Sequence, residues 1–127
     1  MAKNQGKYVD GFVLVVPKKR VAEYRKMARD GGKMWMKYGA LEYKECQLED
    51  ANPKWVTFTF PKMTKAKPNE TVWFSYIVYK SKKHRDEVNK KAHKEMMKSD
   101  ICKPGEPMPF YMARMTYGGF KVEVSGE

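Results

Sequence analysis

Two strongly apolar segments rich in β-branched and aromatic residues constrain the fold of this chain more than any other feature. They are YVDGFVLVV (8–16) and TVWFSYIVYK (71–80), and residues of these types favour extended strands. Apolar side chains occupy successive positions in both segments, which is typical of strands that are covered on both faces. We therefore predict two central strands in one sheet whose two faces are both buried.

Each of these strands is followed by a segment whose apolar residues recur at helical spacing. The first segment covers 18–38, where Gly31-Gly32 indicate a kink or a break and Gly39 is placed to end the helix. Ser81 has the chemistry of an N-cap residue and predicts a second helix over 82–97. The pairing of strand and helix therefore occurs twice along the chain.

Two further strands are predicted from weaker patterns. Alternating polarity at 40–48 favours an exposed strand near a sheet edge. Residues 112–124 form a last strand, with a bulge at Gly118-Gly119. Residues 55–60 are compatible with a short strand, and the basic, proline-bounded stretch after them is typical of a loop. Proline and glycine also predict a loop at 100–109.

The order of these elements is β-α-β-insert-β-α-β, which is the split βαβ pattern of ferredoxin-like folds. We predict one domain over residues 1–127, α+β in class, with a four-stranded antiparallel or mixed sheet and two helices on one face. Since the side chains on both faces of the central strands are apolar, the sheet face without helices must also be covered. A second copy of the same sheet is the simplest cover and predicts a homodimer.

Four segments of the chain carry a resemblance to a known family. They are YVDGFVLVVP (8–17), GALEYKEC (39–46), TVWFSYIVYKSKKHRDEVN (71–89) and RMTYGGF (114–120). Together they resemble the YbaA-like family of bacterial proteins, a domain of unknown function (number 1428) in the dimeric α+β barrel superfamily. The resemblance implies a ferredoxin-like protomer that pairs with a second protomer into a barrel, and it implies no activity. The superfamily includes cofactor-independent monooxygenases, so an enzyme of that kind is one alternative function.

An excess of basic residues is concentrated around the two predicted helices. Lys and Arg number 26 against 15 Asp and Glu, which gives a formal net charge of +11. If the first and third strands lie side by side and parallel, both helices begin at one edge of the sheet, where free N–H groups favour anions. We expect a site there for a phosphate, a carboxylate or a nucleic-acid backbone. Its residues are Lys18, Lys19, Arg20, Lys82, Lys83, His84 and Arg85. Alternatively, these side chains extend into water, with Asp86 and Glu87 offsetting their charge.

A second candidate site centres on Asp10, the acidic residue of the first central strand. Gly11 would let a helix approach closely, so we expect its face to meet the helices and the Asp10 face to meet the cavity between two protomers. A buried carboxylate needs a partner, and Arg114 is the leading candidate, with Tyr76 and Tyr117 as hydroxyl neighbours. Either Asp10 acts as a base while Arg114 holds a small anionic ligand, or the two form a structural ion pair at the dimer seam.

The chain offers few other chemical signals. No apolar run approaches the ~20 residues needed to span a bilayer, and the polar segment 1–7 lacks the apolar core of a signal peptide. Cys46 and Cys102 form no CxxC pattern, so we expect reduced thiols, a cytoplasmic protein and no membrane partner. His84 and His93 lack the spacing of a helical ligand pair, and no phosphate-binding glycine loop is present. We therefore expect neither a metal nor a cofactor.

These observations favour a cytoplasmic homodimer of unknown activity that binds a small molecule in its barrel cavity. A polyanion-binding or nucleic-acid-binding module that uses the basic helix starts is an alternative. Nucleic-acid binding is less favoured because no RNP-like aromatic motif accompanies the basic residues. Lysines on the solvent faces of two amphipathic helices also account for most of the charge excess without any partner.

Overall fold

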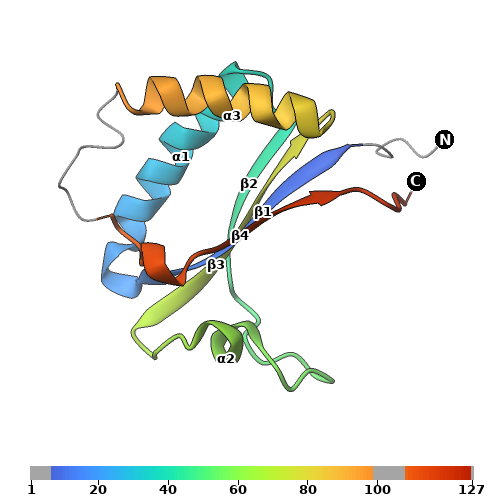
Figure 1. Cartoon of the computed structure of the whole chain (residues 1–127). Helices are drawn as coiled ribbons and strands as arrows, with labels where there is room; N and C mark the ends of the chain where they lie inside the picture. Colours follow the sequence, from blue (N-terminus) through green and yellow to red (C-terminus); the bar gives the residue numbers. More distant parts are fainter. Residues whose placement is uncertain (1–6, 99–107, 127) are drawn as a thin grey trace.

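The computed structural model describes residues 7–98 and 108–126 of the chain, drawn in Figure 1. In chain order its elements are β1 (Tyr8–Pro17), the 3-10 turn η1 (Lys18–Arg20), α1 (Val21–Lys37), β2 (Glu42–Gln47), α2 (Phe60–Thr64), β3 (Glu70–Tyr79), α3 (Lys82–Met96), the 3-10 turn η2 (Met112–Arg114) and β4 (Thr116–Lys121). The two long strands, β1 and β3, are the two apolar segments of the sequence, which confirms both as strands.

The four strands form one sheet in the order β2-β3-β1-β4, and each neighbouring pair is antiparallel. The two apolar strands are therefore the centre of the sheet, as their composition predicts. Helices α1 and α3 cover one face, whereas α2 lies on the opposite side (Figure 1). We call the face without α1 and α3 the open face. The arrangement is the predicted α+β, ferredoxin-like fold.

The ends of the two long helices follow their expected chemistry. The Ser81 hydroxyl accepts a hydrogen bond from the His84 backbone N–H over 3.1 Å at the start of α3. Gly39 follows α1 with a φ of +109°, a conformation that favours glycine. The predicted break at Gly31-Gly32 is wrong, because α1 runs through both residues. A Cβ on Gly32 would lie 2.8 Å from the Tyr43 ring, so glycine here permits close packing of α1 on β2.

Three local predictions differ from the structure. The glycines of β4 keep a regular register, with Gly119 opposite Asp10 and Gly118 opposite Gly11, so there is no bulge between them. The expected strand at 55–60 is not formed. Instead, Thr59 caps the short helix α2, whose last residues replace part of the expected loop. Most of the predicted loop at 100–109 lies outside the described residues, as does Cys102.

Two clusters of buried apolar residues lie between the sheet and the helices. One includes Trp35, Tyr79 and Val88, which come from α1, β3 and α3. The other includes Tyr24 and Trp73, whose rings meet edge to face with centroids 4.9 Å apart. Residues of both clusters also line a cavity, so the core of the protomer is not completely filled.

Candidate functional site

A cavity of about 420 Å³ lies between the sheet and helices α1 and α3. Its walls are mainly apolar and rich in aromatic rings. These rings belong to Phe12, Tyr24, Trp35, Tyr43, Phe110 and Tyr117. A concave, largely apolar space with a few polar groups is typical of small-molecule sites. The cavity is therefore the candidate functional site of this chain.

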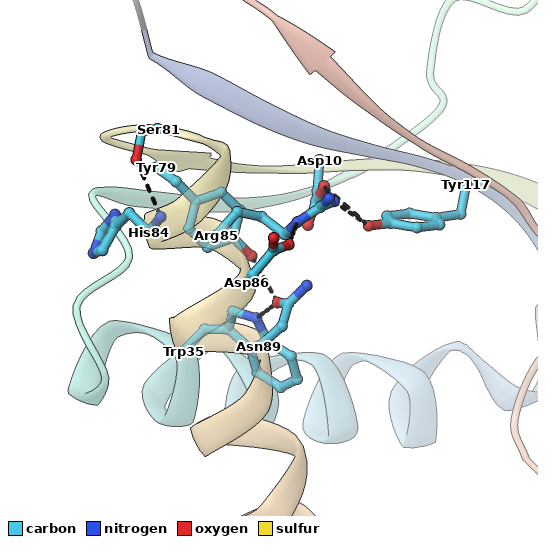
Figure 2. A network of polar contacts seen from close by, with 9 residues as sticks. All are labelled: Asp10, Trp35, Tyr79, Ser81, His84, Arg85, Asp86, Asn89 and Tyr117. Atoms are coloured by element: carbon cyan, nitrogen blue, oxygen red, sulfur yellow. Dashed lines mark hydrogen bonds and ion pairs between the residues drawn. The ribbon is translucent and has the colours of Figure 1, made fainter.

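Asp10 lies in this cavity and is one of the most deeply buried polar residues, with 1% of its surface exposed. Its Oδ1 accepts hydrogen bonds from Arg85 Nη1 over 2.7 Å and from the Tyr117 hydroxyl over 3.0 Å (Figure 2). Its Oδ2 is buried without a hydrogen-bond partner among the described residues. An unpaired buried acceptor is costly, so a donor that reached this atom would be stabilised by it.

The placement of Asp10 corrects the predicted orientation of β1. Asp10 faces the helices, and Gly11 faces the opposite side, where the Phe120 ring lies 3.4 Å from the position of a Cβ. The cavity is consequently inside one protomer, between its sheet and helices, and not in a space between two protomers. Glycine at position 11 permits the close approach of a side chain from the neighbouring strand, and not the approach of a helix.

Arg85 reaches Asp10 from the first turn of α3. Its guanidinium also donates to Asp86 and to the Tyr117 hydroxyl, both over 2.7 Å, and lies over the Tyr8 ring at 4.9 Å. The Tyr117 hydroxyl thus accepts from Arg85 and donates to Asp10. Burial, followed by the Asp10 charge, raises the pKa of Tyr117, so its hydroxyl remains protonated at neutral pH.

Asn89 fixes the helices against the sheet beside this network. Its Oδ1 accepts from the Trp35 indole over 2.9 Å and from the Tyr79 hydroxyl over 3.0 Å (Figure 2). One side chain of α3 therefore holds α1 and β3 in place. Because Asn89 and Trp35 also line the cavity, this contact defines part of the cavity wall.

Glu45 is the second carboxylate of the cavity and lies on β2. Its Oε1 accepts from the Tyr24 hydroxyl and its Oε2 from the Tyr43 hydroxyl, each over 2.8 Å. Burial raises the pKa of the Glu45 carboxyl, and the tyrosine hydrogen bonds oppose only part of that effect. The sheet register places Glu45 two strands away from β1, roughly 10 Å across the sheet.

Arg114 does not pair with Asp10, so that prediction is wrong. Its guanidinium donates to Glu70 over 3.1 Å and to the carbonyls of Thr64 and Lys65 over 2.9 and 3.0 Å. It therefore ties the end of α2 to β3, because carbonyls at a helix C-terminus lack partners within the helix.

Tyr76 also lies away from Asp10. It donates to Glu42 over 3.0 Å and lies next to the Phe74 ring on the open face. Of the three predicted neighbours of Asp10, Tyr117 is the one that touches it.

The two basic helix starts do not meet. Since β1 and β3 are antiparallel, the turns that follow them lie at opposite ends of the sheet (Figure 1). Arg20 is held by Glu23 and the Met108 carbonyl, and Arg85 turns into the core. The side chains that remain exposed are those of Lys18, Lys19, Lys82 and Lys83. The expected shared anion site is therefore not formed.

His84, the remaining member of the expected anion site, has a structural contact. Its Nδ1 accepts from the backbone N–H of Lys80 over 3.0 Å. Among residues 7–98 and 108–126, no group of three or more His, Cys, Asp or Glu side chains is arranged to hold a metal ion. No helix in these ranges is long and apolar enough to cross a membrane.

Comparison with solved structures supports the fold. A protein described as "Putative antibiotic biosynthesis monooxygenase from Nitrosomonas europaea" superposes with a TM-score of 0.56. The match covers 97% of this chain and 96% of that chain, at 11% sequence identity. At this level of identity the likeness shows a shared fold.

Comparison of sequences identifies the family. The proteins described as "Uncharacterized protein YbaA" from Escherichia coli (strain K12) and Shigella flexneri are 42% identical to this chain over 115 residues. Each match covers 91% of this chain and 95% of the relative. The family model described as "Protein of unknown function (DUF1428)" matches residues 7–112. The chain therefore belongs to the DUF1428 family, as the resemblance of its segments implies.

Proposed function

We propose that this protein binds a small, largely apolar organic molecule in the cavity between its sheet and helices. The observation that carries the proposal is the cavity itself, whose mainly apolar lining includes the buried Asp10 carboxylate, and the Oδ2 of Asp10 has no partner among the described residues. Leaving such an acceptor unpaired costs about 1–3 kcal/mol. A hydroxyl or amino group of a ligand would remove that cost.

The surroundings of Asp10 suit a binding site. Arg85 and Tyr117 hold one carboxylate oxygen in place and leave the other without a donor from the described residues. A carboxylate already fixed by two donors loses little freedom when a ligand binds. The cavity of about 420 Å³ also falls within the usual range for ligand pockets, ~300–1,000 Å³.

The proposed functional unit is a cytoplasmic homodimer that pairs through the open face. Phe74 and Phe120 lie on this face with 44% and 62% of their surface exposed. Their contact with the same side chains of a second copy would remove this apolar surface from water. The free, exposed thiol of Cys46 suits a reducing compartment.

A second candidate function is cofactor-independent oxygenation of the bound molecule. Its support is the fold shared with the Nitrosomonas europaea protein, together with a carboxylate, Asp10, in the cavity lining, a residue type that can act as a general base. Oxygen uptake with a naphthohydroquinone probe tests it. The rate of oxygen uptake with the wild-type protein must exceed the rate without protein, and it must be lower with the Asp10→Asn variant. Equal rates with the wild-type protein and the variant would exclude this function.

The binding proposal is tested by titrating the protein with benzyl alcohol and following backbone amide signals by NMR. We expect saturable shifts around the cavity. Ala28→Phe places a ring in the cavity and should weaken binding at least about tenfold, because Ala28 is buried and lines it. Ala22→Phe makes the same change at an exposed position of the same helix and should leave binding unchanged.

Two outcomes would overturn the binding proposal. One is the absence of saturable binding of benzyl alcohol and of its amine and carboxylate analogues by the wild-type protein. The other is equal affinity in wild-type protein and a folded Ala28→Phe variant, since the probe would then bind elsewhere. A thermal unfolding curve of each variant establishes that it is folded.

A further inference from the structure

The charged side chains that line the cavity are acidic, in a chain that is strongly basic. The chain carries 26 Lys and Arg against 15 Asp and Glu. Yet the carboxylates of Asp10 and Glu45 line the cavity, and no lysine or arginine among the described residues does so. The local charge of the cavity is thus opposite in sign to the charge of the protein.

The two carboxylates differ in how their charge is balanced. Asp10 forms an ion pair with Arg85 at 2.7 Å. Glu45 has no Lys, Arg or His nitrogen within 4.0 Å in the described part of the chain. An unbalanced carboxylate inside a protein is unfavourable and attracts a cation.

The groups that surround Glu45 are neutral donors. Tyr24 of α1 and Tyr43 of β2 each donate one hydrogen bond. Ser75 of β3 is paired with Glu45 in the sheet, and its side chain is a further contact that lowers the pKa of Glu45. From α3, His93 lines the same cavity and meets the Trp35 ring edge to face. None of these groups is a fixed cation.

Glu45 retains the capacity to bind a further donor. An ionised carboxylate has about four lone-pair sites; the two tyrosine hydroxyls occupy one on each oxygen, and the Ser75 side chain accounts for at most one more. The aromatic rings of Tyr24, Tyr43 and Trp35 line the cavity around it. Aromatic rings beside a carboxylate form a favourable environment for an organic cation.

We infer that the natural ligand of this cavity is a protonated amine with an apolar body, whose ammonium group pairs with Glu45. This inference rests on the proposed binding function and adds the chemical class of the ligand. The ammonium donates to the carboxylate oxygens of Glu45, and the apolar body fills the space towards Phe12 and Leu14. Anionic molecules of the same size are disfavoured by the two carboxylates.

Three probes that share one ring and differ in charge test the inference. Calorimetric or NMR titration gives the affinities of benzylamine, benzyl alcohol and benzoate. We expect benzylamine to bind roughly 10- to 100-fold more tightly than benzyl alcohol, the effect of one charge-assisted hydrogen bond. Benzoate should bind most weakly of the three.

Two glutamates of the same strand provide a variant and its matched control. Glu45→Gln should abolish the preference for benzylamine over benzyl alcohol while leaving the affinity for benzyl alcohol nearly unchanged. Glu42→Gln should preserve the preference, because Glu42 is bound by Tyr76 on the open face. A folded Glu45→Gln variant that still prefers the amine would overturn the inference.

The wild-type protein supplies a test that needs no variant. Protons compete with the ammonium for Glu45, so the affinity for benzylamine should fall as the pH is lowered towards the folded-state pKa of Glu45, which burial raises. The affinity for benzyl alcohol should change little. Equal affinities of amine and alcohol would overturn the inference and leave the proposed function intact. Binding of none of the three probes would overturn both.

Discussion

Arg85 Nη1 lies 2.7 Å from Asp10 Oδ1, although 75 residues separate the two in the chain. The bridge joins the first turn of α3 to the N-terminal part of β1. Only 13% of the arginine side chain and 1% of the aspartate side chain are exposed. The ion pair therefore holds the Asp10 carboxylate in the cavity wall. It also fixes the position of α3 relative to β1.

Replacing Arg85 should destabilise the fold strongly. Arg85→Met leaves the buried Asp10 charge without its cation, and breaking a buried pair in this way costs about 3–5 kcal/mol. Urea unfolding measures the loss. Lys82→Met, at an exposed position of the same helical turn, should change stability by less than about 0.5 kcal/mol. A similar, small effect of both substitutions would contradict the structural role of the pair.

Glu70 should contribute stability that is lost in acid. The backbone N–H of Lys67 and then the Arg114 guanidinium hold the pKa of Glu70 below its usual range. A lowered folded-state pKa gives stability above the unfolded-state pKa, which disappears as the pH falls through the folded-state value. Urea unfolding curves over a pH series should show this decline in wild-type protein and a weaker decline in Glu70→Gln. An equal decline of stability with pH in the two proteins would be evidence against the contacts of Glu70 with Lys67 and Arg114.

The contribution of Glu45 to stability should change with pH in the opposite direction to that of Glu70. Burial raises its pKa in the folded protein, so the folded state binds more protons than the unfolded state between the two pKa values. Its contribution is present below the unfolded-state pKa and is lost as the pH rises through the folded-state pKa. In the same pH series, Glu45→Gln should remove this loss on the alkaline side. An unchanged pH profile would argue that Glu45 is fully solvated.

The two glycines of α1 should respond differently to alanine. A Cβ at Gly32 meets the Tyr43 ring at 2.8 Å, which forces the ring away and disturbs its hydrogen bond to Glu45. Gly32→Ala should therefore lose about 1–3 kcal/mol. At Gly31 the nearest atom is the Tyr43 hydroxyl at 3.5 Å, an ordinary contact. Gly31→Ala should gain about 0.5–1 kcal/mol from helix propensity. Thermal unfolding that ranks the variants in reverse would contradict the packing of α1 on β2.

Dimerisation through the open face should depend on Phe74. Light scattering at micromolar concentration should give the mass of a dimer for wild-type protein and of a monomer for Phe74→Lys, because a charge is costly in an apolar interface. Met97→Lys changes an exposed apolar residue at the end of α3 and should leave the dimer intact. A monomeric wild-type protein would refute the proposed assembly.

The elements of the fold could be predicted because their signals are local. Strand composition identified β1 and β3, Ser81 marked the start of α3 and Gly39 marked the end of α1. The strand between α1 and the insert was also visible in its alternating polarity. These features depend on residues that are close in the chain.

Asp10 and its neighbour Tyr117 could be predicted, but the rest of the site could not, because it depends on long-range geometry. Strand alternation separates Asp10 from Gly11, but it does not say which of them faces the helices. The pairing of Asp10 with Arg85 requires the antiparallel register of β1 and β3 and the rotation of α3. One sequence signal did point to Glu45. It lies two residues after Tyr43, so both side chains are on the same, more apolar face of the strand.

A crystal structure of the protein grown with 4-bromobenzylamine would show where the ligand lies, because anomalous scattering locates the bromine. We expect a bromine peak inside the cavity between the sheet and helices α1 and α3, with the ammonium nitrogen within hydrogen-bonding distance of Glu45. A cavity left without the probe at saturating concentration, or a bromine bound only on the open face near Phe74, would contradict this expectation.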